Sequence, residues 1–190
     1  PICRWAQPPV QAVLDLRQAH NLTSEDVESI EITTFHNSKR LAKRAPVTTE
    51  EAQYSTAYPT AVAMARGRVD PDDVMEQSFS DPEIRRLADG MTVVESDTYN
   101  AAFPANRISS VTLTLKNGQT LTSGDTEALG DPEKPVTEGE VKAKFHKYAR
   151  PKLGHDRSDA LETAVGQLGN GEGLETLQGL IFAPVHAEKR

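Results

Sequence analysis

The first twenty residues carry apolar side chains at helical spacing. Val13 and Leu14 follow Val10 by three and four residues, so the three side chains lie on one side of a helix. Polar residues lie between and after them, and a proline pair precedes them. That pattern is typical of an amphipathic helix, and proline is well tolerated in the first turn of a helix. We therefore predict a helix over about residues 9–20, with Asn21 as its stop.

Strands are predicted where apolar and polar residues alternate. The alternation runs over residues 28–35 and again over 108–115 and 119–124, on the two sides of Asn117-Gly118. Alternation indicates a strand with one buried face, and an Asn-Gly pair between two such stretches is a strong hairpin signal. We predict a small antiparallel sheet that includes this hairpin, between residues 108 and 124.

Capping signals place helices between the predicted strands. Thr48 and Glu51 have the spacing of a capping box, so a helix should begin near residue 49. Pro59 disfavours helical geometry at Tyr58, which leaves two alternatives, a helix kinked there or a fresh helix that starts with Pro59. Two more short helices are expected, one that begins at Asp70-Pro71 and one that begins at Asp81-Pro82. Gly67 and Gly90 are expected to end helices, and a short strand is expected over residues 91–95.

The last third of the chain reads as a polar loop followed by helices. Residues 124–136 are rich in glycine, proline and charge. Val141, Phe145 and Tyr148 then repeat at helical spacing, in a helix expected to end before Pro151. Two further helical segments are expected, at residues 156–168 and 173–182.

The pattern as a whole predicts an α+β fold. We expect a small domain over residues 1–150, in which the sheet packs with helices, and a helical tail over residues 151–190. Hydrophobic residues make up 37% of the chain and aromatic residues only 5%. This composition suits either a domain with some apolar surface against a partner or an ordinary domain with a small core.

The charge of the chain excludes some function classes. The formal net charge is −7, so a nucleic-acid partner is not expected. An anionic substrate would need a local basic cluster, and Lys39, Arg40, Lys43 and Arg44 form one. That cluster could attract such a substrate, or it could be a solvated loop or partner contact.

The sequence contains few residues suited to redox or metal chemistry. Cys3 is the single cysteine, so no internal disulfide can form, and a reducing, cytoplasmic setting is the default. No apolar run approaches the length needed to cross a membrane. No metal site is expected, because the histidines lack ligand spacing. They are His20, His36, His146, His155 and His186.

Four stretches, in order, resemble segments of the MmgE/PrpD family. Residues 1–5 (PICRW) resemble its YP-x-C-R-W segment, and residues 48–58 (TTEEAQYSTAY) resemble its EAQ-F/Y-S…Y segment. Residues 102–105 (AFPA) and 130–135 (GDPEKP) also match its pattern. The family includes 2-methylcitrate dehydratase, cis-aconitate decarboxylase and an iminodisuccinate epimerase, which act on small polycarboxylates without a metal or organic cofactor.

The resemblance implies a two-domain enzyme in which this chain is the smaller part. Family members pair a large helical domain with a small α+β lid domain, the active site lies between them, and the chain end returns to the helical domain. This sequence would supply the lid and the returning tail. The helical domain would then be a partner in cis or a separate subunit, and relatives are dimeric, so a homodimer is expected.

The resemblance assigns a catalytic or substrate-contacting tyrosine to Tyr58. A phenol can donate a hydrogen bond or relay a proton, and a helix start offers free N–H groups to a carboxylate. The alternative is a tyrosine buried in the core for structural reasons. Both remain open at this stage.

Cys3 and Arg4 are the expected substrate-binding residues. An arginine guanidinium can grip a carboxylate through two hydrogen bonds. Cys3 stands where some relatives place a histidine, and a neutral thiol is a poor substitute for an imidazole acid. The alternatives are a buried, inert thiol and an arginine in a surface or interdomain ion pair.

Two functions from different classes follow. The first is a lyase or isomerase part, in which Arg4 and Tyr58 act from the lid and the base comes from the helical domain. The second is a non-catalytic binding module, or a subunit of a split enzyme that is inactive alone. In either case the isolated chain is expected to show little activity.

Overall fold

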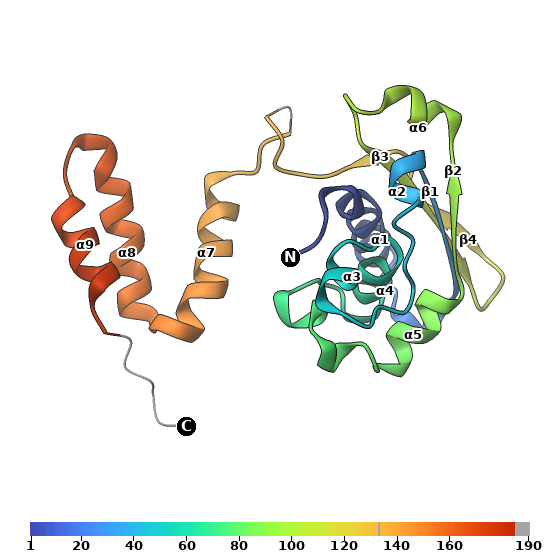
Figure 1. Cartoon of the computed structure of the whole chain (residues 1–190), viewed down its shortest axis with the longest axis horizontal. Helices are drawn as coiled ribbons and strands as arrows, with labels where there is room; N and C mark the ends of the chain where they lie inside the picture. The colour runs from blue at the N-terminus through green and yellow to red at the C-terminus, as the bar shows by residue number, and fades with distance from the viewer. Residues whose placement is uncertain (133, 185–190) are drawn as a thin grey trace. The chain divides into compact units, whose positions relative to one another are not determined.

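The structure, a computed structural model, describes residues 1–132 and 134–184 (Figure 1). The chain divides into two compact units, Pro1–Ala128 and Leu129–Arg190, here the first and second unit. The described residues are mixed helix and sheet, so the predicted α+β fold is confirmed. His186, Glu133 and the end of the expected tail lie outside the described residues.

The first unit is built on a sheet with the strand order β2-β1-β3-β4, and β5 pairs with β3. The strands are β1 Val27–Thr34, β2 Met91–Glu95, β3 Ile108–Leu115, β4 Thr120–Thr122 and β5 Thr126–Glu127. The predicted hairpin is confirmed, because β3 and β4 are antiparallel neighbours. The sheet is mixed and not wholly antiparallel, since β2 runs parallel to β1 after a long helical crossover.

One face of this sheet is apolar and covered by helices. Ile30 lies opposite Leu113 and Ile32 opposite Val111 across the β1–β3 pair, and all four side chains are buried. Directly opposed side chains on one face are the unit of sheet stabilisation, and a slip of one residue would expose them all. The alternation seen in the sequence therefore fixes both the buried face and the register.

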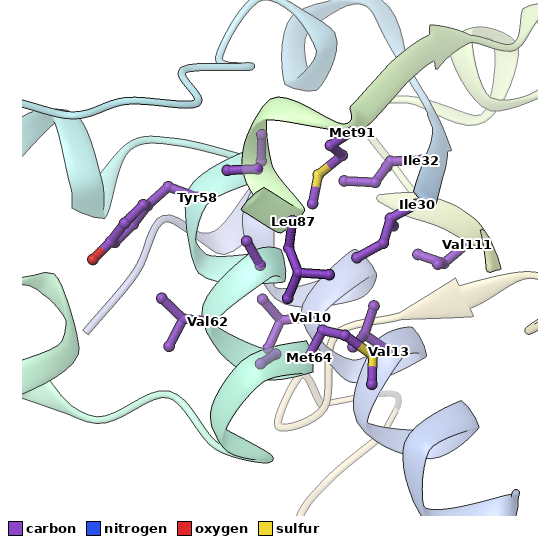
Figure 2. Close-up of a cluster of buried hydrophobic side chains, with 14 of the residues drawn as sticks. Val10, Val13, Ile30, Ile32, Tyr58, Val62, Met64, Leu87, Met91 and Val111 are labelled. Carbon is purple, nitrogen blue, oxygen red and sulfur yellow. The ribbon is translucent and has the colours of Figure 1, made fainter. Parts of the chain in front are cut away.

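The first unit contains the α-helices α1 to α6, of which α2 is a single short turn. They are α1 Gln7–Ala19, α2 His36–Lys39, α3 Thr49–Gln53, α4 Ala57–Arg66, α5 Pro82–Asp89 and α6 Asp97–Ala102. α1 packs on the sheet, and α4 packs on both α1 and α5. Figure 2 shows side chains from these helices and from the strands meeting in one cluster, among them Val10, Val13, Ile30, Val62, Met64, Leu87 and Val111.

The two alternatives around Pro59 are resolved in favour of two helices. α3 ends at Gln53 and α4 begins at Ala57, with Pro59 in its first turn, where no N–H partner is lost. Gly67 ends α4 with a φ of 67°, a conformation that glycine adopts without steric cost. The Thr48 hydroxyl accepts from the Glu51 N–H, so the predicted cap of α3 is confirmed.

The sequence pattern does not predict several short elements of the first unit, among them α6 and β5. α6 is capped by Ser96, whose hydroxyl accepts from the Tyr99 N–H, and this Ser was the local signal for it. β5 has only two residues and falls inside the predicted loop, so no periodicity could reveal it. Both lie where the chain enters or leaves the sheet.

The second unit contains α7 Glu138–Leu153, α8 His155–Gln167 and α9 Leu174–Phe182, with α8 packed against each of the other two. The prediction that the first helix ends before Pro151 is wrong, because α7 includes this proline in its last turn. Near a helix end a missing N–H costs a single hydrogen bond, and the Gly154 N–H closes the turn on the Arg150 carbonyl at 2.9 Å. α7 spans residue 150, the boundary expected between domain and tail.

The described helices of the second unit bury very little of their own surface. Only Ser158 and Ala164 are buried in them. Their larger apolar side chains are exposed, including Val141, Phe145, Val165, Leu174, Ile181 and Phe182. Nowhere in residues 1–132 and 134–184 is there a helix with the length and apolar character needed to cross a membrane.

Candidate functional site

Polar segments gather at one end of the first unit. β1 and β2 are parallel, so their carboxyl ends lie at the same edge of the sheet, where α2 and α6 follow them (Figure 1). In α/β proteins ligands commonly bind outside the carboxyl ends of parallel strands. We call this region the carboxyl edge, and it comprises residues 3–5, 36–44, 53–56 and 95–103.

Aromatic contacts bring the start of the chain to the carboxyl edge. The ring of Trp5 packs edge-on against Phe35 and against Phe103, with centroids 5.8 Å apart in both pairs. Phe35 and Phe103 stack on each other at 4.7 Å. The three rings come from distant parts of the sequence, so they lock together the segments before α1, after β1 and after α6.

Cys3 and Arg4 stand directly before this aromatic group. The Cys3 N–H donates to the Gln53 carbonyl at 2.8 Å, which ties the chain start to the end of α3. The Arg4 guanidinium donates to Gln7 Oε1 at 2.7 Å and to the Ala128 carbonyl at 3.5 Å. Both residues are half-buried, so Arg4 is oriented by the protein while part of it stays accessible.

The predicted basic cluster also lies at the carboxyl edge. Its backbone is held by buried hydroxyl groups at the start of α4. The Thr56 hydroxyl donates to the Ser38 carbonyl at 2.9 Å, the Thr56 N–H donates to the Leu41 carbonyl at 2.8 Å, and Ser55 Oγ donates to the Lys43 carbonyl. The segment is therefore fixed to α4 while its cationic side chains project outward.

A surface hollow of about 420 Å³ accompanies this segment. Its lining comprises Lys39, Arg40, Leu41, Ala42, Lys43, Glu51 and Tyr54. Glu51 is the acidic group there, and it pairs with Lys43 at 3.0 Å. The carboxyl edge is thus locally rich in positive charge on a chain whose formal net charge is −7.

His36, Glu95 and Asn100 form a hydrogen-bonded group at the same edge. Glu95 Oε2 lies 3.0 Å from His36 Nδ1, and Asn100 Nδ2 donates to Glu95 Oε1 at 2.7 Å. The His36 N–H in turn donates to Asn100 Oδ1 at 2.6 Å, which closes the ring. The hydrogen bonds from His36 and Asn100 lower the pKa of the Glu95 carboxyl below its usual range.

No sequence pattern indicates this group. His36 is one of five histidines without ligand spacing, and its partners are 59 and 64 residues away in the sequence. Only the parallel pairing of β1 with β2 brings them together, and that pairing was not predicted. Knowing that β1 and β2 are neighbouring parallel strands would have been enough to predict that His36 lies near Glu95.

Tyr58 lies in the first turn of α4, but its side chain points into the protein. It is 1% exposed, and its hydroxyl donates to the Asp73 carbonyl at 2.9 Å. Burial raises the pKa of this phenol to about 12. In Figure 2 the ring stands at the margin of the hydrophobic cluster, and its hydroxyl is directed away from Leu87 and Met91.

The Asp73 partner of Tyr58 belongs to an ion-pair network. Its carboxylate is 1% exposed and binds Arg66 and Arg68, the latter at 3.0 Å. Arg66 also pairs with Asp81 at 3.0 Å. Because a buried carboxylate needs such partners, this network ties the end of α4 to the start of α5.

The structure brings some of the predicted site residues together and leaves one apart. Cys3, Arg4 and the basic cluster share the carboxyl edge, whereas the Tyr58 hydroxyl is directed to Asp73. This geometry favours a structural bond for that hydroxyl within the first unit, and a catalytic role for Tyr58 stays a prediction. Across the residues that the structure describes, no three His, Cys, Asp or Glu side chains are grouped to hold a metal ion.

Comparison with known proteins gives the family. The sequence profile of the MmgE/PrpD C-terminal domain matches residues 1–169. The chain belongs to the MmgE/PrpD family. The match covers all of the first unit and most of the second, and a domain described as C-terminal implies an amino-terminal partner domain.

One curated relative within this family is similar to part of the chain. It is the mitochondrial 2-methylcitrate dehydratase of Yarrowia lipolytica, which is 30% identical over 105 residues. The matched region is 52% of this chain and 20% of that protein. The chain therefore spans about a fifth of the relative's length in this comparison.

Proposed function

We propose that this MmgE/PrpD chain supplies the lid half of the active site of a cofactor-independent lyase or isomerase that acts on a small polycarboxylate. The reaction closest to the family relative is dehydration of 2-methylcitrate. One observation carries the proposal above the others. The carboxyl edge collects Arg4 and the basic cluster on a chain of net charge −7, which is where an anionic substrate would be held.

The chemistry of such a reaction explains why cations are needed there. A proton on carbon beside a carboxylate is weakly acidic, and its removal builds negative charge on the substrate. Preorganised hydrogen-bond donors and cations near that charge lower the barrier. Arg4 would grip one carboxylate through its planar fork, and the basic cluster would raise the local substrate concentration.

The remaining predicted site residues take supporting roles in this proposal. Cys3 would line the substrate site beside Arg4 as a small, neutral side chain. The Tyr58 hydroxyl donates a hydrogen bond to the Asp73 carbonyl, but its oxygen keeps lone pairs that can accept another hydrogen bond. For Tyr58 to act on a substrate, the amino-terminal domain would have to bring that substrate to the start of α4.

The base belongs, in this proposal, to the helical domain that family members place before the lid. The second unit would return to that domain, and its exposed apolar side chains would pack against it. Unpartnered apolar surface on α7 and α9 is consistent with such a role, because the described helices of this unit bury so little. A homodimer of the complete protein completes the assembly.

An activity assay tests this proposal. The complete protein, with its amino-terminal domain, is incubated with 2-methylcitrate, cis-aconitate or iminodisuccinate, and products are followed by NMR. Turnover of one of these polycarboxylates is expected, and the 190-residue chain alone should show little or none. Absence of turnover with all three would favour the non-catalytic binding module, and turnover by the chain alone would refute the division of labour.

A further inference from the structure

The group formed by His36, Glu95 and Asn100 has a geometry that a simple surface ion pair does not need. Each member bonds to both of the others. His36 lies in α2 after β1, Glu95 is the last residue of β2, and Asn100 lies in α6. A surface salt bridge by itself contributes little to stability. Asn100 bonds to both the Glu95 carboxylate and the His36 backbone, so it fixes the orientation of both residues, which a simple ion pair does not require.

The orientation concerns the imidazole of His36. An ionised carboxylate can only accept hydrogen bonds, so the proton in the His36–Glu95 bond sits on Nδ1. The opposite nitrogen, Nε2, has no protein partner among the residues that the structure describes. The side chain is 60% exposed, so Nε2 faces solvent and can meet a bound molecule.

The surroundings of His36 suit a negatively charged ligand. Lys39 Nζ lies 4.0 Å from Glu95 Oε2, and Lys39 also lines the basic hollow. Phe35, which precedes His36, packs against Trp5, which follows Arg4. The imidazole therefore stands at the same edge as the groups proposed to hold substrate carboxylates.

We propose that His36 is a general acid at the carboxyl edge, with Glu95 and Asn100 as its positioning residues. This inference rests on the proposed function and extends it to the elimination of a hydroxyl group. An imidazole whose Nδ1–H is held by a carboxylate has a fixed tautomer and ring orientation, which is how histidine acts in many acid–base sites.

A base of the amino-terminal domain takes the proton from carbon, and the electron pair of that C–H bond forms the new double bond. The C–O bond of the neighbouring carbon breaks, and its electron pair goes to oxygen. That oxygen takes the proton from His36 Nε2 and leaves as water, and the neutral imidazole keeps its Nδ1–H on Glu95 until solvent reprotonates Nε2.

The test uses the complete protein with His36→Gln and 2-methylcitrate. Loss of a general acid typically costs about 10²–10⁴-fold in rate, so kcat should fall in this range while KM changes little. Glu95→Gln should lose about 10–100-fold, the range known for groups that orient the histidine ligands of metal sites. His20→Gln is the matched control, because His20 is an exposed histidine at the end of α1, away from the carboxyl edge.

A substrate analogue separates acid catalysis from a structural role. When chloride replaces the leaving hydroxyl group, departure needs no proton, so His36→Gln should match the wild type on this analogue. Equal loss on both substrates, or no loss on either, would overturn the inference while wild-type turnover leaves the proposed function standing. Absence of wild-type turnover would overturn both together.

Discussion

At the scale of single residues, Tyr58 shows how burial changes the use of a side chain. In the sequence it stands at a helix start, which suits contact with a substrate. In the fold its hydroxyl is the partner of a buried backbone carbonyl, that of Asp73. A carbonyl that loses its donor inside a protein pays the cost of its lost hydration.

Tyr58→Phe should therefore lower the stability of the 190-residue chain. Removing one partner of a buried hydrogen bond costs about 1–3 kcal/mol, and urea unfolding followed by circular dichroism measures the loss. Tyr54→Phe is the matched control, because Tyr54 is 57% exposed and its hydroxyl should contribute nothing measurable. Equal stabilities of the two variants would show that the hydroxyl of Tyr58 is not structural.

Residue-scale prediction from sequence succeeded where the signal was local. Thr48, Asn21 and Gly67 each end or begin a helix as their side chains or backbone freedom indicate. The group of His36, Glu95 and Asn100 escaped, because it depends on which strands are neighbours. Local patterns do not contain that information.

At the scale of elements, the basic segment depends on hydroxyl groups of another helix. Thr56 is fully buried, and its side chain bonds to the Ser38 carbonyl and lies 3.2 Å from Ser38 Oγ. These bonds fix residues 38–43 to the start of α4. The segment would otherwise be a cationic loop that repels itself.

Thr56→Val should loosen that segment without a large change of volume. The bonds from its hydroxyl would be lost at a cost of about 1–3 kcal/mol, so local opening should rise by about fivefold or more. Trypsin cleavage after Lys39, Arg40 and Lys43, read by mass spectrometry, measures the opening. Thr60→Val is the control, because the Thr60 hydroxyl bonds only within α4, to the Thr56 carbonyl. Similar cleavage rates in the two variants would contradict this account.

Element types were predicted well because their signals are periodic. α1, α5, the β3–β4 hairpin and the helices after residue 138 all follow from spacing and caps. The parallel pairing of β1 with β2 did not follow, because it requires a crossover through α2 to α5 that only tertiary packing sets. The continuation of α7 through Pro151 did not follow either, because the last turn of a helix tolerates a proline at the cost of one backbone hydrogen bond.

At the scale of the whole molecule, acid should destabilise the chain. Several carboxyl groups have lowered pKa values, and that of Glu83 falls to about 2 because Arg86 donates hydrogen bonds to it. A carboxyl whose folded pKa lies below its unfolded value contributes stability above the unfolded value, and this stability is lost as pH falls toward the folded value.

For Glu83 the loss should therefore occur between about pH 4.5 and 2. The thermal midpoint of the chain should stay nearly level from pH 7 to 5 and then drop as pH falls to 3, as followed by circular dichroism. Glu83→Gln should reduce the drop, because this group no longer titrates. A midpoint that rises or stays constant below pH 4.5 would contradict the prediction.

The division into two units also belongs to this scale. The first unit has a continuous core of strands and helices, whereas the described part of the second unit buries almost no apolar side chains. The low aromatic content of the chain, 5%, agrees with a protein whose second unit needs outside partners. The core of the first unit could be anticipated from alternation and helical spacing, but the boundary between units could not.

Substitution of Arg4 tests most directly whether the carboxyl edge holds the carboxylates of the substrate. The measurement is kcat/KM for 2-methylcitrate in the complete protein with Arg4→Gln, beside Arg85→Gln as a matched exposed control on α5. Loss of a charged hydrogen-bonding partner of a carboxylate costs about 2–5 kcal/mol, so kcat/KM should fall by at least about 30-fold. A kcat/KM for Arg4→Gln equal to that of Arg85→Gln would contradict the claim.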